Sequence, residues 1–325
     1  MSQAQTSTLV PVPQATTAMH PKVSVCMTTY NHARFIAQAL DSVLAQRTTF
    51  DYEIVIGEDC STDGTRETVL RYWQQNPSRI RVLLAGKNLG VVRNTERTIQ
   101  ACRGDYIAML EGDDYWTDVH KLQHQAELLD AEPDAFICGA RAHVWKDGEP
   151  QPSCVSPSQA SEVLATYGAR ELFEGKWWFR SCTKMLPRPM MQGAPRRFMQ
   201  DWAGTLWLIA RTDFGKVCFL DRVVGGYREH AGGVWSSQNR THHAIEDAQT
   251  LFRVIPLFKG QDRRYLEGLL QYNVATLLES DDVLRSVRIR CAAIAAFRSP
   301  GNPQSWRNLK TSVRLAFVNR RQEIA

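Results

Sequence analysis

Short apolar runs alternate with amphipathic stretches up to residue 144 of the chain. The strand-like runs share length and apolar composition: 23–28, 52–57, 80–84, 106–110 and 135–144. Between the first two runs, residues 34–46 carry apolar side chains at helical spacing. Helices are also expected over 63–75, where Pro77 marks the end, and over 94–102 and 121–130. Because strands and helices alternate, we expect an α/β fold with a mostly parallel sheet and helices on both of its faces.

The alternation weakens after residue 145 and the pattern becomes helical beyond residue 233. The elements expected first are a loop over 146–159, a helix over 161–173, a short strand over 183–186, a helix over 201–211 and a strand within 217–228. The later helices are expected over 242–258, 263–278, 282–297 and 305–319. We therefore expect a flexible tail over 1–21, a main domain over 22–235 and a helical extension over 236–325.

Composition and charge describe an ordinary soluble protein, with 43% hydrophobic and 22% charged residues. A net charge of +5 is too mild to imply nucleic acid, but it is compatible with anionic ligands or a membrane surface. The eight cysteines contain no CxxC pair, which argues against zinc and disulfide scaffolds and favours a reducing cytoplasm. Residues 1–20 lack the features of a signal peptide, and no apolar run is long enough to span a bilayer.

The most informative stretch is the end of the apolar run 106–110, which passes directly into Glu111-Gly112-Asp113-Asp114 and then Tyr115-Trp116. Adjacent carboxylates repel each other, and a divalent metal that carries a phosphate-containing ligand would offset their charge. The alternative is a polar turn after a strand, because Gly-Asp-Asp is also good turn chemistry.

Two other polar segments follow predicted strands, at residues 28–30 and 58–59. Ligands of parallel α/β sheets bind beyond the carboxyl ends of the strands. We therefore expect these two segments and the aspartate pair to converge on one crevice.

The ordered series of motifs resembles the inverting glycosyltransferases of family 2, which have the GT-A fold and transfer sugars from nucleotide diphosphates. The series comprises residues 23–31, 58–65, 88–90, 93–94, 104–107 and 113–114, and the resemblance covers residues 22–235. Glu111 stands where the family more often has an aspartate. The resemblance implies a GT-A domain followed by a C-terminal helical extension.

The resemblance also implies a nucleotide site. Thr28 and Tyr30 would border the nucleotide, with the Tyr30 ring against the base. Asp59 would accept the N3–H of uracil or thymine, which favours UDP or dTDP over CDP. Arg93 would reach the diphosphate or brace the aspartate pair, and Asp113 would face the ribose. The alternatives are a capping carboxylate for Asp59 and an ordinary surface arginine for Arg93.

The remaining implied roles concern the metal and the base. Asp114 would bind Mg²⁺ or Mn²⁺, and His230 would contribute to the metal or the diphosphate. Asp201 would take the proton from the acceptor hydroxyl as it attacks the anomeric carbon. Gln200 replaces the glutamate that the family usually has before this base. A helix cap for Asp201 and a packing role for His230 are the alternatives.

These assignments imply a nucleotide-diphospho-sugar as donor and a glycan, a glycolipid or lipid-linked saccharide, or a protein as acceptor, in surface glycan biosynthesis. A non-catalytic nucleotide-sugar or saccharide-binding module is an alternative. A nucleotidyltransferase is another, although it would need a glycine-rich loop after the first strand, and residues 28–34 contain no glycine. Adjacent Asp113 and Asp114 cannot flank a glycosidic bond as a glycoside hydrolase requires.

The expected helix over 305–319 has Trp306, Leu309, Val313 and Phe317 on one face, with basic residues beside them. This pattern is typical of a helix that lies on anionic lipid. The alternative is a helix that docks on the main domain with a solvated basic edge. The expected location is the cytoplasm, with peripheral contact at the inner face of the membrane.

Overall fold

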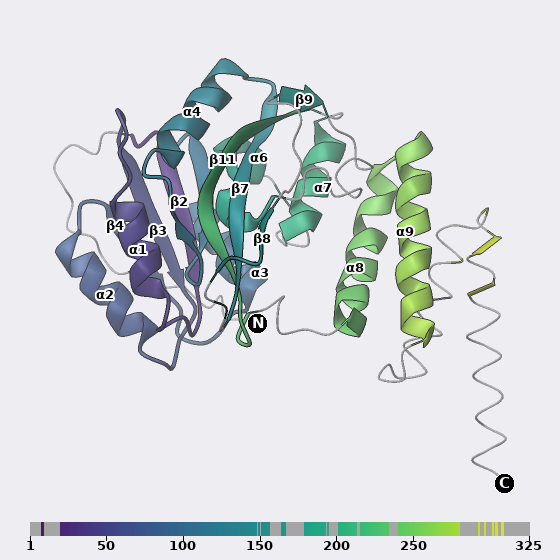
Figure 1. Ribbon diagram of the computed structural model, residues 1–325, viewed down its shortest axis with the longest axis horizontal. Coiled ribbons are helices and arrows are strands. Elements are labelled where there is room, and N and C mark those ends of the chain that lie inside the picture. Colours follow the sequence, from purple (N-terminus) through teal and green to yellow (C-terminus); the bar gives the residue numbers. More distant parts are fainter. Residues whose placement is uncertain are drawn as a thin grey trace, which may run out of the picture. The chain divides into compact units, whose positions relative to one another are not determined.

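The computed structural model describes residues 8–9, 20–147, 149, 151–156, 164–166, 179–192, 194, 201–212, 215–233 and 240–279, with isolated positions between 292 and 308 (Figure 1). The chain divides into two compact units, the first ending at His230 and the second containing the residues from Ala231 onward. The expected domain boundary after residue 235 and most of the expected tail over 1–21 lie outside the described residues.

Four parallel strands form the first half of the sheet in the first unit. They are β2 (Val23–Thr29), β3 (Tyr52–Glu58), β4 (Ile80–Leu84) and β5 (Tyr106–Glu111), in the order β4-β3-β2-β5. Every residue of β2 and β3 is buried, because helices cover both faces. The strands expected from the apolar runs are confirmed here.

The second half of the sheet is mixed. Its elements are β10 (Met185–Pro187), β7 (Ala135–Lys146), β11 (Lys216–Glu229) and β6 (Tyr115–Trp116), in the order β5-β10-β7-β11-β6. The strand β11 runs parallel to β7 and antiparallel to β6. Three short strands extend the sheet. The strand β1 (Thr8–Leu9) pairs with β4, β8 (Cys154–Ser156) pairs with β7, and β9 (Leu164–Thr166) pairs with β11.

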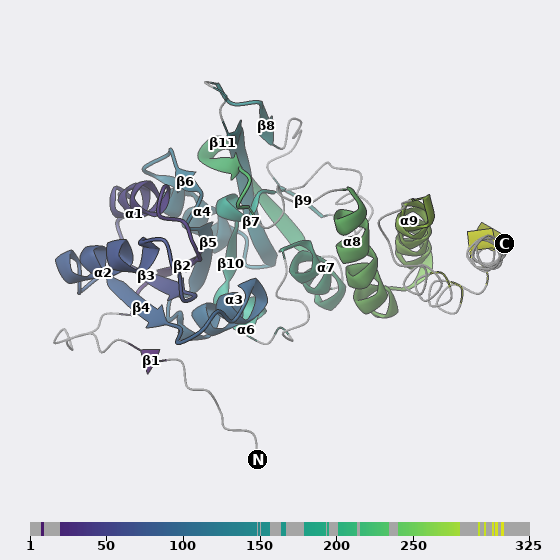
Figure 2. The same cartoon turned by 90° about the horizontal axis from the view of Figure 1, so that it is seen from below.

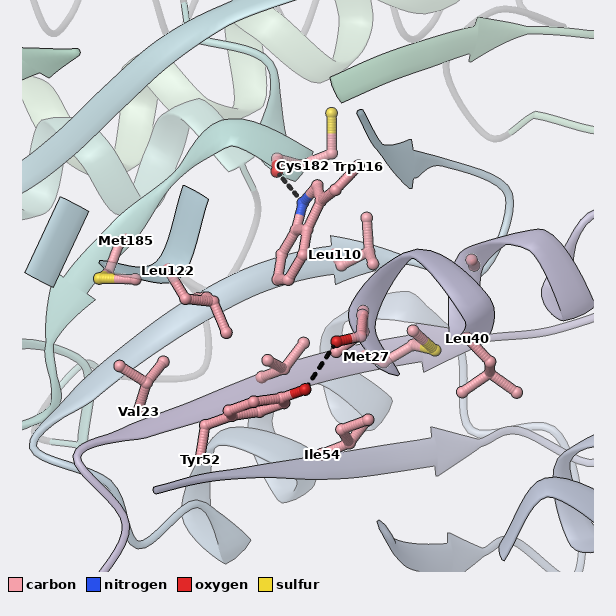
Figure 3. Packing of buried hydrophobic residues seen from close by; sticks show 14 of the residues in the cluster. Val23, Met27, Leu40, Tyr52, Ile54, Leu110, Trp116, Leu122, Cys182 and Met185 are labelled. Carbon is pink, nitrogen blue, oxygen red and sulfur yellow. Dashed lines mark hydrogen bonds between the residues drawn. The ribbon is translucent and has the colours of Figure 1, made fainter. Parts of the chain in front are cut away.

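Helices pack on both faces of this sheet, as the alternating pattern predicts. One face carries α1 (Ile36–Leu44), α2 (Thr65–Gln75) and α4 (Lys121–Ala131), which share one apolar cluster with β2, β3 and β5. Leu40 and Leu122 meet Met27 and Ile54 in this cluster (Figure 3). On the other face α3 (Val91–Ala101) packs against β2, β3 and α6 (Arg188–Gln192) (Figure 2).

The expected helix over 161–173 is wrong at its centre, where Leu164–Thr166 forms β9. This strand pairs antiparallel with Lys216–Cys218 of β11. A partner so distant in sequence provides the hydrogen bonds, so local helical spacing could not reveal it. The expected loop over 146–159 likewise contains β8, which pairs with β7.

The remaining helices follow the expected positions. They are α7 (Asp201–Arg211), α8 (Arg240–Val254), which continues into a 3₁₀ turn at Ile255–Leu257, and α9 (Gly260–Glu279). A short 3₁₀ turn that was not expected, η1 (Ser181–Thr183), precedes β10. Most of the helices expected over 282–297 and 305–319 lies outside the described residues. Among the helices that are described, none combines the length and the apolar character needed to cross a membrane.

One charged side chain is enclosed in the core of the first unit. Lys121, at the start of α4, has no exposed surface. Its Nζ donates to Oε1 of Gln125 at 2.7 Å and lies 4.2 Å from the centroid of the Trp116 ring. Burial lowers the pKa of Lys121 to about 7.

This lowered pKa makes the stability of the protein depend on pH. An unfolded lysine titrates near pH 10.4, so between about pH 7 and that value the unfolded chain binds more protons than the folded chain. Stability therefore rises with pH across this window. From about pH 7 to about pH 9 the free energy of unfolding should rise by about 2 kcal/mol more in the wild type than in Lys121→Met. Denaturant titrations at several pH values measure this, and parallel pH profiles would contradict it.

Candidate functional site

The polar segments that follow β2, β3 and β5 lie at one edge of the sheet. Thr29 pairs with Glu58, and Thr28 pairs with Glu111, so the three strands end side by side. The amide of Gly112 donates to the carbonyl of Thr28 at 2.8 Å. The expected convergence of residues 28–30, 58–59 and 113–114 is therefore confirmed.

Asp113 lies between two histidines at this edge. Its Oδ2 is 3.0 Å from Nε2 of His230 and 3.6 Å from Nε2 of His32. Burial alone would raise the pKa of Asp113, but the hydrogen bond with His230 and the charge of His32 hold that pKa below its ordinary value. The aspartate therefore remains an anion next to two imidazoles. The sequence motifs indicated His230 but gave no signal for His32.

Asp114 points in a different direction and is only 1% exposed. Its Oδ1 accepts the backbone amide of Arg228 at 2.8 Å, and the thiol of Cys182 beside the same carboxylate lowers its pKa. Burial, together with the charges of Asp113 and Glu111, raises the pKa of Asp114 well above its ordinary value. The structure thus brings His230 to Asp113, while Asp114 faces β11 and η1.

A positively charged side chain, Arg228, lies beside residues 111–114, which we call the acidic loop. The guanidinium of Arg228 donates to the carbonyl of Asp113 and to the side chain of Gln38. It lies 5.0 Å from the ring centroid of Phe35 and 4.3 Å from that of Tyr115. Burial lowers the pKa of Arg228, but the group stays charged, and the aromatic rings fix it next to the aspartates.

Asp59 is also buried, with 2% of its surface exposed. Its two carboxylate oxygens accept the backbone amides of Leu89 and Gly90 at 2.8 and 2.9 Å. Each oxygen keeps a second lone pair, so a contact with a nucleobase stays compatible with this geometry. Arg93 follows in the first turn of α3 and is exposed. Tyr30 is 41% exposed at the end of β2.

Arg97 is a contributor that the sequence motifs did not indicate. Its Nη2 donates to the carbonyls of Glu58 at 2.8 Å and Leu83 at 3.1 Å, and its Nε donates to Asn94 at 2.9 Å. Burial lowers its pKa and the charge of Asp59 raises it. This side chain ties the ends of β3 and β4 together next to Asp59.

The expected base, Asp201, begins the helix α7. Its side chain lies outside what the structure describes, so its role as the base stays a prediction. The roles of Thr28, Tyr30, Asp59 and Arg93 toward a nucleotide likewise stay predictions.

The donor atoms near Asp113 fit a divalent cation. Oδ2 of Asp113 and Nε2 of His230 lie 3.0 Å apart, an ordinary hydrogen-bond distance, and both are kinds of atom that bind divalent cations. Among the described residues, no group of three or more His, Cys, Asp and Glu side chains is arranged to hold a metal by itself. A metal bound here would therefore take further oxygens from water or from a phosphate-containing ligand, which is how Mg²⁺ is usually held.

Comparison of the sequence with known families places this site in context. The profile described as Glycosyl transferase family 2 matches residues 24–188. The chain is 32% identical over 223 residues to an uncharacterized protein of Mycobacterium tuberculosis (strain ATCC 25618 / H37Rv), a match that covers 66% of this chain and 61% of that protein. It is 33% identical over 130 residues to TuaG of Bacillus subtilis, which is named as a teichuronic acid biosynthesis glycosyltransferase; this match covers 40% of the chain and 50% of TuaG. Each match thus spans less than two thirds of the length of the relative.

Two solved structures share the fold at low sequence identity. TarS 1–349 of S. aureus in complex with UDP is 16% identical, with a TM-score of 0.57 and 90% of each chain covered. The mannosyltransferase PcManGT of Pyrobaculum calidifontis, in complex with GDP-Man and Mn²⁺, is 18% identical with a TM-score of 0.57. That match covers 96% of this chain and 84% of PcManGT.

The acidic loop depends on the absence of a side chain at Gly112. A Cβ there would lie 2.6 Å from Oγ1 of Thr29 and 3.0 Å from Nδ1 of His32. Gly112→Ala should therefore lower the free energy of unfolding by about 1–3 kcal/mol, because the loop or β2 must shift. The control is Gly86→Ala, since a Cβ on Gly86 would meet no atom within 4 Å. Denaturant unfolding of both variants measures the effect, and equal stability of the two would contradict it.

Proposed function

Because the chain belongs to glycosyltransferase family 2, we propose that it transfers a sugar from a nucleoside diphosphate, UDP or dTDP, to an acceptor hydroxyl with inversion, and that it uses Mg²⁺ or Mn²⁺. Its sheet and flanking helices match the GT-A glycosyltransferases, as the resemblance implied. The acceptor would be a glycan, a glycolipid or a protein. The naming of TuaG for teichuronic acid biosynthesis supports a surface glycan as the product.

The observation that carries the proposal is the group formed by Asp113, His230 and Arg228 at the carboxyl ends of the strands. We assign Asp113 and His230 to the metal, because their donor atoms face each other and Asp114 is directed toward Arg228 and Cys182. A metal held there would supply charge stabilisation to the leaving diphosphate. Arg228 adds positive charge beside the same position.

The nucleotide would lie along the edge formed by β2 and β3. Tyr30 would stack on the base, Asp59 would accept its N3–H, and Thr28 and Arg93 would contact the ribose or the diphosphate. TarS has been solved with UDP and with UDP-GlcNAc, and PcManGT with GDP-Man and Mn²⁺, which supports a nucleotide-sugar as donor. Guanine also carries N–H donors that Asp59 could accept. Binding measurements must therefore decide between uracil or thymine on one side and guanine on the other.

In the transfer step Asp201 would accept the proton of the acceptor hydroxyl. The hydroxyl oxygen would form a bond to the anomeric carbon from the face opposite the diphosphate. The bond between that carbon and the diphosphate oxygen would break, and the nucleoside diphosphate would leave with the electron pair. One displacement of this kind inverts the anomeric centre.

Nucleotide binding tests the donor and the metal ligands together. Thermal unfolding should be followed with UDP, dTDP, GDP and CDP, each with and without Mn²⁺. UDP or dTDP at ~100 times its Kd should add about 2.7 kcal/mol, a shift of several degrees, in the presence of Mn²⁺. Asp113→Asn should abolish the Mn²⁺-dependent part of this shift, whereas Asp114→Asn should retain it.

The reverse result for the two variants would assign the metal to Asp114, as the resemblance alone implied. A preference for CDP would contradict the assignment of Asp59. If no nucleotide shifts the wild-type protein, the donor site is misplaced and a saccharide-binding module becomes the better account.

Turnover tests the base. Asp201→Asn should lower the rate of sugar transfer ~10²–10⁴-fold while the affinity for the nucleotide stays as in the wild type. Steady-state kinetics together with nucleotide titration separates the two effects. An unchanged rate would remove Asp201 as the base, and a loss of nucleotide affinity would indicate a binding role instead.

A further inference from the structure

A buried polar cluster lies under the acidic loop, separate from the proposed ligands of metal and nucleotide. It consists of Lys121 and Gln125 on α4, Trp116 of β6, and the turn η1. Lys121 and Gln125 are both fully buried. A lysine in such a place needs an explanation.

Lys121 is placed where a cation is costly. It stands at the N-terminal end of α4, where the partial positive charge of the helix opposes an ammonium. Its hydrogen-bond acceptor is the neutral amide of Gln125, and burial lowers its pKa to about 7. The titratable groups around it are Asp118, Cys138 and Cys182. An apolar side chain of similar volume would fill this space at a lower cost in free energy.

Lys121 and two backbone carbonyls fix the orientation of the Gln125 amide. The Nζ atom of Lys121 donates to Oε1 of Gln125 at 2.7 Å, so the amide oxygen is directed toward the lysine. Its NH₂ group is then directed at the carbonyls of Thr183, at 2.8 Å, and Cys138, at 3.3 Å. Reversal of the amide would place its oxygen against these two carbonyls.

The carbonyls held in this way belong to the turn that supports the site. The indole N–H of Trp116 donates to the carbonyl of Cys182 at 2.7 Å (Figure 3), and Gln125 holds the next carbonyl, that of Thr183. From the other side of the turn, the hydroxyl of Ser181 donates to Glu111 at 2.8 Å. The thiol of Cys182 lies beside Asp114 and influences its pKa, and Glu111 leads directly into the residues 112–114 that contain both aspartates.

We propose that Lys121 is a positioning residue for the metal–nucleotide site: through Gln125 and the turn Ser181–Thr183 it holds Glu111 and Asp114, and hence Asp113 between them. The expected effect of Lys121 on nucleotide binding rests on the proposed function, whereas its support of the loop is a property of the free protein. Nucleotide titration therefore tests the first, and hydrogen exchange of the free protein tests the second.

The test compares Lys121→Met with Leu122→Met in the full chain. Leu122 is the fully buried neighbour in the same helix turn and packs only in the apolar cluster. Hydrogen exchange of the free protein should show faster exchange over residues 111–116 and 181–184 in Lys121→Met and not in Leu122→Met. Titration with UDP and Mn²⁺ should show an affinity about 10- to 100-fold weaker in Lys121→Met, the range expected when a group that supports a metal ligand is lost.

Wild-type exchange rates in both segments of Lys121→Met would overturn the positioning role, whatever the nucleotide data show. Faster exchange with unchanged affinity would also overturn it, because the loop would then not need the support. If the wild type binds no nucleotide, the proposed function fails while the exchange result still decides the positioning. Should Lys121→Met not fold, Gln125→Glu takes its place, since it keeps an acceptor for Lys121 and loses the donors to Thr183 and Cys138.

Discussion

The structure depends on how two adjacent carboxylates are accommodated where a buried strand ends. Burial and mutual repulsion both disfavour two charges at Asp113 and Asp114, and the surrounding elements resolve the conflict by separating them. Asp113 faces the imidazoles of His230 and His32, and Asp114 turns to the amide of Arg228 and the thiol of Cys182. One carboxylate thus remains an anion at the edge of the site, while burial favours the neutral form of the other.

The second half of the sheet supplies the groups that hold the two carboxylates apart. The strand β11 lies next to β7 and ends at the acidic loop, so Arg228 and His230 reach the aspartates from a segment more than a hundred residues later in the chain. The pairing of β11 with β6 places Tyr115 against the Arg228 guanidinium. The turn η1 completes the enclosure by contacting Glu111 and Asp114. These elements add Trp116, Cys182 and Cys218 to the apolar core and also supply the groups that surround the two carboxylates.

Periodicity predicted the main strands and helices up to residue 144 well, because most of them bury apolar side chains of their own. The convergence of the polar segments followed from the parallel order of the strands. The helix predicted over 161–173 is wrong at β9, because this strand is formed by pairing with β11, which local sequence spacing cannot indicate. Contacts between distant side chains were also hidden: no motif indicates that His32 meets Asp113, that Arg97 ties β3 to β4, or that Lys121 is enclosed in the core. The resemblance implied that Asp114 and His230 both contribute to the metal, whereas in the structure His230 contacts Asp113.

Asp113 and His230 are proposed to form the protein's part of a metal site for a nucleoside diphosphate. The decisive experiment is a crystal structure of the protein with UDP and Mn²⁺, with the metal located by its anomalous scattering. We expect the ion within about 2.3 Å of a carboxylate oxygen of Asp113 and of Nε2 of His230, with diphosphate oxygens completing its coordination. An ion bound by Asp114 with Asp113 turned away, or a diphosphate held at this edge with no ion between it and Asp113, would contradict it.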